Sequence, residues 1–193
     1  MLAIGGSTRA GSTTEAALRI AADGAASAGA DVRFVTGPDL LMPMYDGRAG
    51  DVDPARARLV DGVRWAHGLL VASPGYHGAV SGLVKNALDH IEDLRLAPDG
   101  GPSDRPYLDG VGVGCIAVAQ GWQAGVSTLH QLRTIVHALR GWPTPLGVVV
   151  NTGQDGVEAN SDALRLVGEQ VVEFARMRRA LHPDEAPHPD EKP

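Results

Sequence analysis

The feature that most constrains the fold is the alternation of short apolar runs with longer segments of helical periodicity. The strand-length runs cover residues 1–4, 31–36, 68–73, 111–119 and 146–151. The helical patterns cover residues 13–28, 54–65, 81–93, 126–139 and 158–181. Strands that alternate with helices predict a parallel sheet, and the continuous apolarity of the later runs is typical of strands buried on both faces. We therefore expect an α/β fold with five parallel strands and helices on both faces of the sheet.

The chain length fits one domain. A chain of 193 residues that is 44% hydrophobic can bury a substantial core. We expect a single domain over residues 1–181 and a flexible C-terminal tail over 182–193, HPDEAPHPDEKP. The histidines and carboxylates of this tail could form a metal clamp, but charged, Pro-rich termini are usually solvated, and we expect no metal site. The segment 37–53 is expected to be a long loop, and the Pro/Gly-rich connection APDGGPSDRP at 97–106 is expected to be a surface excursion.

The charge and the apolar runs exclude several classes of partner. A formal net charge of -6 gives no electrostatic footprint for nucleic acid. The apolar runs are too short to span a membrane, and no signal peptide precedes the first strand, so we expect a cytoplasmic protein. The single cysteine, Cys115, is expected to be buried for packing and unreactive, because no basic residue adjoins it in the sequence.

The ligand-binding residues are expected in the loops that follow the strands. In an open parallel sheet, ligands bind beyond the carboxyl ends of the strands. The relevant loops have the sequences GGSTRAGSTT at 5–14, SPGYHGAVSG at 73–82 and AQGWQAG at 119–125.

The first loop has the composition of an anion site. It differs by one residue from the nucleotide-binding pattern G-x-x-x-x-G-K-[ST], because Ser12 stands where that pattern has lysine. Without the lysine, triphosphate hydrolysis is not expected, and the G-x-G-x-x-G pattern of dinucleotide sites is missing as well. A helix N-terminus with Ser7, Ser12 and Thr14 as donors and Arg9 as counter-charge suits one phosphomonoester. The alternative is an ordinary turn in which Ser12 caps the helix.

The other two loops can accommodate a flat ring. Glycines expose backbone amides and carbonyls, Tyr76 can lie against a ring, and Trp122 follows Gly121. Taken alone, Tyr76 and His77 could equally be ordinary turn residues. The three loops together predict a site for a phosphorylated planar heterocycle.

Two motifs resemble the NADPH-dependent FMN reductase family of the flavodoxin-like fold. The segment GSTRAGST is similar to the GSxRxxS loop of that family, and SPGYHGAVSGLVKNALD is similar to its SPxYxxxxxGxLKNxLD segment. The resemblance extends from residue 1 to about residue 150. It implies a three-layer flavodoxin-like sandwich with strand order 2-1-3-4-5.

The resemblance also implies a set of FMN-binding residues. Ser7, Arg9 and Ser12 would bind the phosphate, and Thr13 and Thr14 belong to the same turn. The isoalloxazine ring would be bordered by Pro74, Gly75, Tyr76 and His77, with Gln120 and Gly121 near its pyrimidine edge. Two positions depart from the family pattern: Thr14 stands where relatives commonly have Asn, and Gly75 replaces a frequent Glu.

The implied activity is that of an NAD(P)H oxidoreductase. Hydride would pass from NADPH or NADH through bound FMN to a quinone, an azo compound, a flavin or another small acceptor, and a role in a bacterial pathway stays open. This chemistry requires no protein-borne catalytic residue. His77 could donate a proton, although a turn histidine is more often solvated. The resemblance further implies a homodimer or homotetramer with the flavin near the interface, in which the region of Lys85 and Asp89 contributes to subunit contacts.

Two alternatives use the same scaffold. One is a flavodoxin-like electron carrier that binds FMN but does not turn over NADPH. The other is a regulator that binds no flavin. Arg9 in the phosphate loop and the segment from Pro74 to Asp89 favour the reductase.

Overall fold

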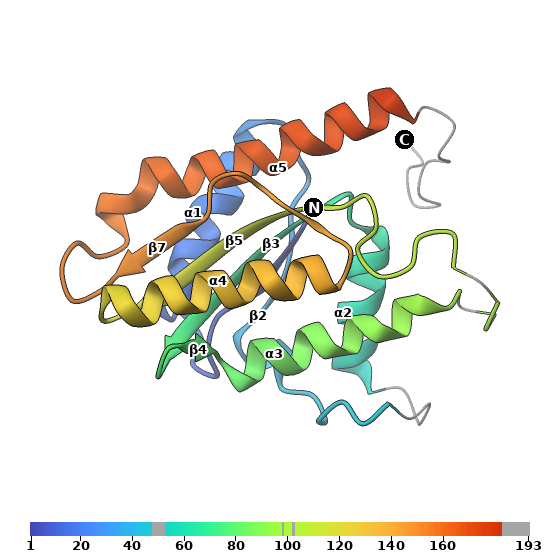
Figure 1. The fold of residues 1–193 in the computed structure, drawn as a ribbon, viewed down its shortest axis with the longest axis horizontal. Coiled ribbons are helices and arrows are strands. Elements are labelled where there is room, and N and C mark those ends of the chain that lie inside the picture. The colour runs from blue at the N-terminus through green and yellow to red at the C-terminus, as the bar shows by residue number, and fades with distance from the viewer. Residues whose placement is uncertain (48–52, 98, 102, 183–193) are drawn as a thin grey trace.

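The computed structural model describes residues 1–47, 53–97, 99–101 and 103–182, and its centre is a parallel sheet (Figure 1). Four strands form most of this sheet: β1 (Leu2–Gly5), β2 (Arg33–Thr36), β3 (Gly68–Tyr76) and β5 (Gly112–Ala119). They run parallel in the order β2-β1-β3-β5. Beyond β5, the short strands β6 (Trp142–Pro143) and β7 (Val148–Asn151) both pair with it in parallel. The predicted order 2-1-3-4-5 is confirmed, with β7 in the place of the predicted strand 146–151, whereas β6 is an added short strand that was not predicted.

The break between β6 and β7 has a local cause. The Thr144 amide still donates to the carbonyl of Val113, but Pro145 follows and has no amide to continue the ladder. A second strand that was not predicted, β4 (Ala79–Val80), pairs antiparallel with the end of β3.

Five α-helices cover the two faces of the sheet. They are α1 (Thr13–Ser27), α2 (Pro54–Trp65), α3 (Gly82–Asp89), α4 (Trp122–Ala138) and α5 (Ser161–Leu181). Three 3₁₀ segments join them: η1 (Gly37–Leu40), η2 (His90–Arg95) and η3 (Glu158–Asn160). The helices α1 and α5 pack on one face, and α2, α3 and α4 pack on the other (Figure 1).

The strands alternate their side chains between two apolar cores. In β3, Leu69 and Val71 face α2, α3 and α4, whereas Leu70 and Ala72 face α1 and α5. All four side chains are fully buried, which explains why the sequence of this strand is continuously apolar. Cys115 of β5 lies in the core that faces α2, α3 and α4, and burial raises the pKa of its thiol to about 12. The prediction of a buried, unreactive cysteine therefore agrees with its environment.

Two glycines allow α1 and α5 to cross with their backbones almost in contact. A Cβ atom at Gly24 would lie 2.2 Å from the carbonyl oxygen of Arg165, and one at Gly168 would lie 2.0 Å from that of Ala21. No side chain fits at either position without separating the helices.

Several predicted boundaries are wrong by a few residues. Strand β3 extends to Tyr76 because its end pairs with β4, and α4 begins at Trp122, four residues before the predicted start. The predicted helix 81–93 ends as an α-helix at Asp89 and continues as η2, while η1 lies inside the predicted loop 37–53. Residues 48–52 of that loop and 183–193 of the predicted tail lie outside the described residues.

The described residues lack two kinds of feature, a membrane-spanning helix and a metal-binding cluster. None of the helices in the described ranges is both long and apolar enough to cross a bilayer. Within the same ranges, no cluster of His, Cys, Asp and Glu has an arrangement that could hold a metal ion.

Candidate functional site

The three loops singled out by the sequence meet at one edge of the sheet. The strands β1, β3 and β5 are adjacent and parallel, and Gly5 pairs with Ala72 while Pro74 pairs with Val118. The loops that follow these strands therefore leave the sheet side by side, at the edge where α1 and α4 begin (Figure 1). This is the edge at which open parallel sheets bind ligands.

Glycine is required where the first loop leaves β1. Gly5 and Gly6 have φ angles of 150° and 105°, and a Cβ at Gly5 would lie 2.2 Å from the carbonyl oxygen of Ala72. The Gly6 amide donates to that same oxygen at 3.4 Å. The turn into the loop is thus pressed against β3 and cannot carry a side chain at its first residue.

Ser12 is the N-cap of α1, as the alternative interpretation of this loop predicted. Its buried Oγ accepts a hydrogen bond from the Glu15 amide at 3.2 Å, and its carbonyl accepts from the Ala16 amide at 2.9 Å. The helix geometry leaves the amides of Thr13 and Thr14 without an intrahelical acceptor. Because the Ser12 hydroxyl is an acceptor in the cap, its proton can still be donated, and capping and anion binding are compatible.

Glu15 is a component of this turn that the sequence interpretation missed. Its Oε2 accepts from the Gly11 amide at 2.9 Å, and its Oε1 accepts from Arg19 at 2.6 Å (Nη2) and 3.1 Å (Nε). The hydrogen bond from Arg19, helped by that from Gly11, holds the pKa of this buried carboxyl below its usual value of 4.5. The spacing S-x-x-E at 12–15 was the available signal, because it is the pattern of a helix capping box.

Ser7 and Arg9 form the rim of the turn. The Arg9 amide donates to Ser7 Oγ at 3.3 Å, so the loop folds back on itself between them. Ser7 is half-buried, whereas Arg9 is exposed. The rim and the start of α1 together present hydroxyls, backbone amides and one guanidinium, a donor set that fits a phosphomonoester.

The second loop is a tight hairpin. Tyr76 pairs with Ala79 across a two-residue turn, His77–Gly78, in which both residues have left-handed φ angles of 52° and 82°. These angles are those of a type I′ turn. Pro74 is buried, Gly75 is half-buried, and Tyr76 and His77 are exposed.

The glycine at position 75 has a packing reason. A Cβ there would lie 2.8 Å from Thr128 Oγ1 and 3.1 Å from the Cβ of Ala119. Because α4 approaches so closely, a long side chain such as that of Glu does not fit at this position on this backbone.

The third loop is held by the loop after β7. Gly121 is the N-cap of α4, and Gln120 beside it is exposed. The exposed indole of Trp122 donates from Nε1 to Gln154 Oε1 at 2.9 Å. Gln154 was missed by the sequence interpretation, since no motif marks it and only its place after a strand could have indicated it.

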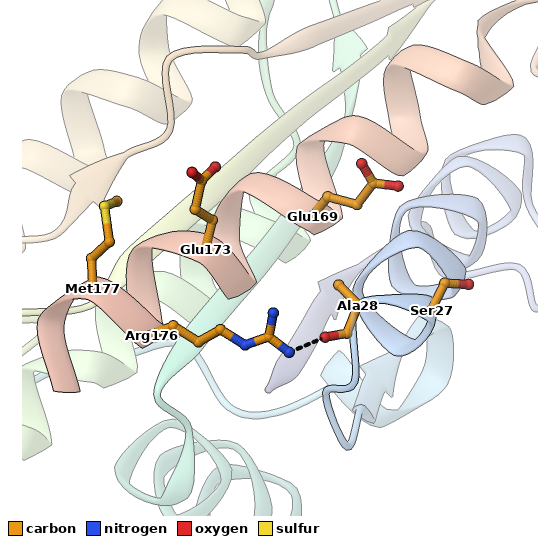
Figure 2. A pocket seen from close by; sticks show the side chains of 6 residues that line it. All are labelled: Ser27, Ala28, Glu169, Glu173, Arg176 and Met177. Atoms are coloured by element: carbon orange, nitrogen blue, oxygen red, sulfur yellow. Dashed lines mark hydrogen bonds between the residues drawn. The ribbon is translucent and has the colours of Figure 1, made fainter. Parts of the chain in front are cut away.

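Two surface hollows lie away from these loops. One, of about 520 Å³, lies where the C-terminal end of α1 meets α5 and is lined by Ser27, Ala28, Glu169, Glu173, Arg176 and Met177 (Figure 2). Arg176 donates there to the carbonyl of Ala28. The other, of about 410 Å³, lies between η2 and the C-terminal end of α4. Neither hollow combines a set of anion-binding donors with exposed aromatic rings, so the loop edge is the better candidate for the chemistry.

Comparisons with known proteins point to one family. A family model described as NADPH-dependent FMN reductase matches residues 1–155. The chain is 29% identical over 136 residues to an NADPH azoreductase of Bacillus sp. (strain OY1-2), covering 69% of each chain. It is 31% identical over 152 residues to an FMN reductase (NADPH) of Pseudomonas aeruginosa, covering 78% of this chain and 70% of that one.

A solved structure supports the fold. A flavodoxin of Streptococcus pneumoniae TIGR4 superposes with a TM-score of 0.60 at 16% identity, over 90% of this chain and 99% of that chain. At this identity the similarity shows the flavodoxin-like fold alone.

Proposed function

The chain belongs to the NADPH-dependent FMN reductase family, and from this membership we propose that it oxidises NADPH through bound FMN and reduces a small electron acceptor. The observation that carries the proposal is the meeting of three parts at one edge of the sheet. One part is the anion cradle, by which we mean Ser7, Arg9, Ser12 and the amides of Thr13 and Thr14 at the start of α1. The other two parts are the hairpin of β3 and β4 and the start of α4.

The phosphate of FMN is assigned to the cradle. Ser7 and Ser12 would donate hydroxyls, Arg9 would supply the counter-charge, and the amides of Thr13 and Thr14 would point at the phosphate from the positive end of α1. A single terminal phosphate suits this set, because the lysine that contacts the further phosphates of a nucleotide is missing.

The isoalloxazine ring is assigned to the other two loops. The backbone of Pro74 and Gly75 and the residues Gln120 and Gly121 would border it, with the exposed rings of Tyr76 and Trp122 on either side. FMN held by these residues would supply the hydride-transfer chemistry between NADPH and the acceptor. The protein would orient the two rings and exclude water from between them, while exposed His77 could donate a proton to a reduced acceptor.

The electron-carrier alternative is less favoured. The flavodoxin-like fold does not separate it from a reductase, because flavodoxins share this fold. The family model and both curated relatives carry names of NADPH-linked enzymes, which favours turnover of NADPH.

Anaerobic stopped-flow absorbance tests the activity directly. The FMN-loaded protein is mixed with NADPH and, separately, with NADH, and bleaching of the flavin is followed. We expect rapid bleaching by NADPH. Flavin that binds but is bleached by neither nucleotide would identify a carrier, and failure to bind FMN at all would support the flavin-free regulator.

The acceptor is tested with the reduced protein. We propose an azo compound, a quinone or free flavin, and the azoreductase of Bacillus sp. makes azo dyes the first choice. Reoxidation is compared across this panel in the absence of oxygen. An acceptor class that reoxidises the protein no faster than buffer is excluded.

We further propose a homodimer or homotetramer. Support comes from the family resemblance of the α3 region, where exposed Lys85 and Asp89 form an ion pair beside the 410 Å³ hollow. Sedimentation velocity should give a mass of two or four times the 20.1 kDa chain. A species of 20.1 kDa at micromolar concentration contradicts the proposal.

A further inference from the structure

The conformation of the His77–Gly78 turn is not stable by itself. His77 has a φ angle of 52°, a left-handed conformation that is unfavourable for a residue with a Cβ atom. The hairpin that closes this turn contains two residue pairs, Gly75 with Val80 and Tyr76 with Ala79. An isolated hairpin of this length is not stable in water. Its conformation must therefore be fixed by neighbouring groups.

Two side chains of α4 provide that support. The hydroxyl of Ser127 donates to the Gly78 carbonyl at 2.7 Å, and Nε2 of Gln131 donates to the same oxygen at 2.8 Å. Oε1 of Gln131 also accepts from the Val80 amide at 3.4 Å. The two residues are four positions apart and so lie on the same side of the helix. Together they hold both the turn and the returning strand.

The helix that carries these side chains is itself fixed against β3. A Cβ at Gly75 would lie 2.8 Å from Thr128 Oγ1 and 3.2 Å from the carbonyl of Ala124, so α4 packs on β3 with no room for a side chain at position 75. Thr128 is fully buried at this contact. This close packing fixes the distance from α4 to the hairpin, and the hydrogen bonds to Gly78 therefore have little freedom to lengthen.

We propose that Ser127 and Gln131 are positioning residues of the flavin site. They hold Gly78 and Val80 so that Tyr76 and His77, on the other side of the turn, keep one orientation toward the flavin ring. This inference rests on the proposed function, because it assumes that the hairpin borders FMN. Neither residue is assigned to the phosphate cradle, and both act through the hairpin.

We call the three hydrogen bonds from Ser127 and Gln131 to Gly78 and Val80 the clamp. The test compares variants that remove the clamp with one that keeps it. Ser127→Ala combined with Gln131→Ala deletes all three hydrogen bonds, and Gln131→Glu keeps the acceptor for Val80 but removes the donor to Gly78. Ser127→Thr retains the hydroxyl and should behave like the original chain. Thr134→Ala is the matched control, because the Thr134 hydroxyl donates within α4, to the His130 carbonyl, and not to the hairpin residues Gly78 and Val80.

The clamp predicts a specific pattern of changes in the FMN-loaded protein. The rate constant for flavin bleaching by saturating NADPH should fall on the order of tenfold in the double variant, as expected from the loss of hydrogen bonds that orient a reacting group. The visible absorbance bands of oxidised bound FMN should shift, while the Kd for FMN changes less than about threefold, because the phosphate cradle is untouched.

Unchanged bands and an unchanged bleaching rate in the double variant would overturn the inference, even if thermal stability fell. If the original chain binds FMN but is not bleached by NADPH, the proposed function fails while the band shift still tests the clamp. A band shift in the double variant that Ser127→Thr does not show supports it.

Discussion

At the scale of single residues, the turn that starts α1 combines opposite charges. Arg9 extends from the exposed rim, while Glu15 lies buried behind the loop with its charge balanced by Arg19. Glu15 fixes the Gly11 amide, and Ser12 fixes that of Glu15. The loop is therefore shaped before any ligand arrives, which lowers the ordering cost of binding.

Arg9→Ala should weaken FMN binding without unfolding the chain. A hydrogen bond to a charged group contributes about 1.5–3 kcal/mol, which corresponds to a Kd raised roughly 10- to 150-fold. Titration of FMN fluorescence or absorbance measures the change. Arg64→Ala, which removes a half-buried arginine paired with Asp61, is the control and should bind FMN normally. Equal affinities for Arg9→Ala and the control would exclude Arg9 from the site.

Glu15→Gln should destabilise the chain in a pH-dependent way. The pKa of Glu15 is lower in the folded chain than its usual 4.5, so the ionised carboxylate contributes stability above pH 4.5. This contribution is lost as the pH falls below 4.5 through the lower pKa of the folded state. We expect the variant to be less stable by roughly 1–3 kcal/mol at pH 7.

Urea unfolding at pH 7 and at successively lower pH values measures this difference. The gap between the original chain and Glu15→Gln should narrow with acidification. Glu169→Gln, at an exposed position of α5, should show no gap at any pH. A gap that stays constant below pH 4.5 would mean that the charge of Glu15 is not its source.

At the scale of elements, the closest packing is the crossing of α1 and α5. Gly168→Ala would place a Cβ 2.0 Å from the carbonyl oxygen of Ala21, so the helices must separate. Overpacking of this kind costs about 1–3 kcal/mol. Chemical denaturation should show this loss, whereas Gly82→Ala, with no heavy atom within 4 Å of the added Cβ, should stay within about 0.5 kcal/mol. Equal stability of both variants would contradict the close crossing.

The elements that the sequence predicted well are those with a strong local signal. The apolar runs of β3 and β5 are buried on both faces, and Asp53 and Ser12 cap helices that begin where their sequence patterns start. The end of β3, which was predicted wrongly, depends partly on contacts distant in sequence. The end of β3 at Tyr76 depends on β4, and that hairpin depends in turn on Ser127 and Gln131.

For the candidate site, too, the sequence indicated the continuous segments but not the contacts between them. The phosphate loop is one continuous segment, so its pattern could be read directly, although the carboxylate of Glu15 was overlooked. The contacts of Gln154 with Trp122 and of Thr128 with Gly75 join separate loops or elements. No spacing in the sequence encodes such contacts, because they arise only when the sheet order brings the elements together.

At the scale of the whole molecule, the site joins loops from strands that are central to the sheet. A ligand that binds the folded chain alone stabilises all of it by mass action, by about 2.7 kcal/mol at 100 times its Kd. For a chain of this size, FMN at that concentration should raise the Tm by roughly 5–10 °C.

Riboflavin is the matched ligand for this measurement, because it has the same ring system without the phosphate. At equal concentration it should raise the Tm much less than FMN, since the cradle at α1 then has nothing to bind. Equal shifts from both ligands would show that the cradle contributes no affinity.

The burial of Cys115 gives the protein an internal reporter of its own unfolding. The thiol is the chain's single cysteine, lies fully buried in β5, and has a pKa raised to about 12. A thiol reagent can therefore modify it only when the centre of the sheet opens, and the rate of modification at neutral pH measures that opening without an introduced label. Added FMN should slow the modification by the same factor by which it lowers the population of the opened chain.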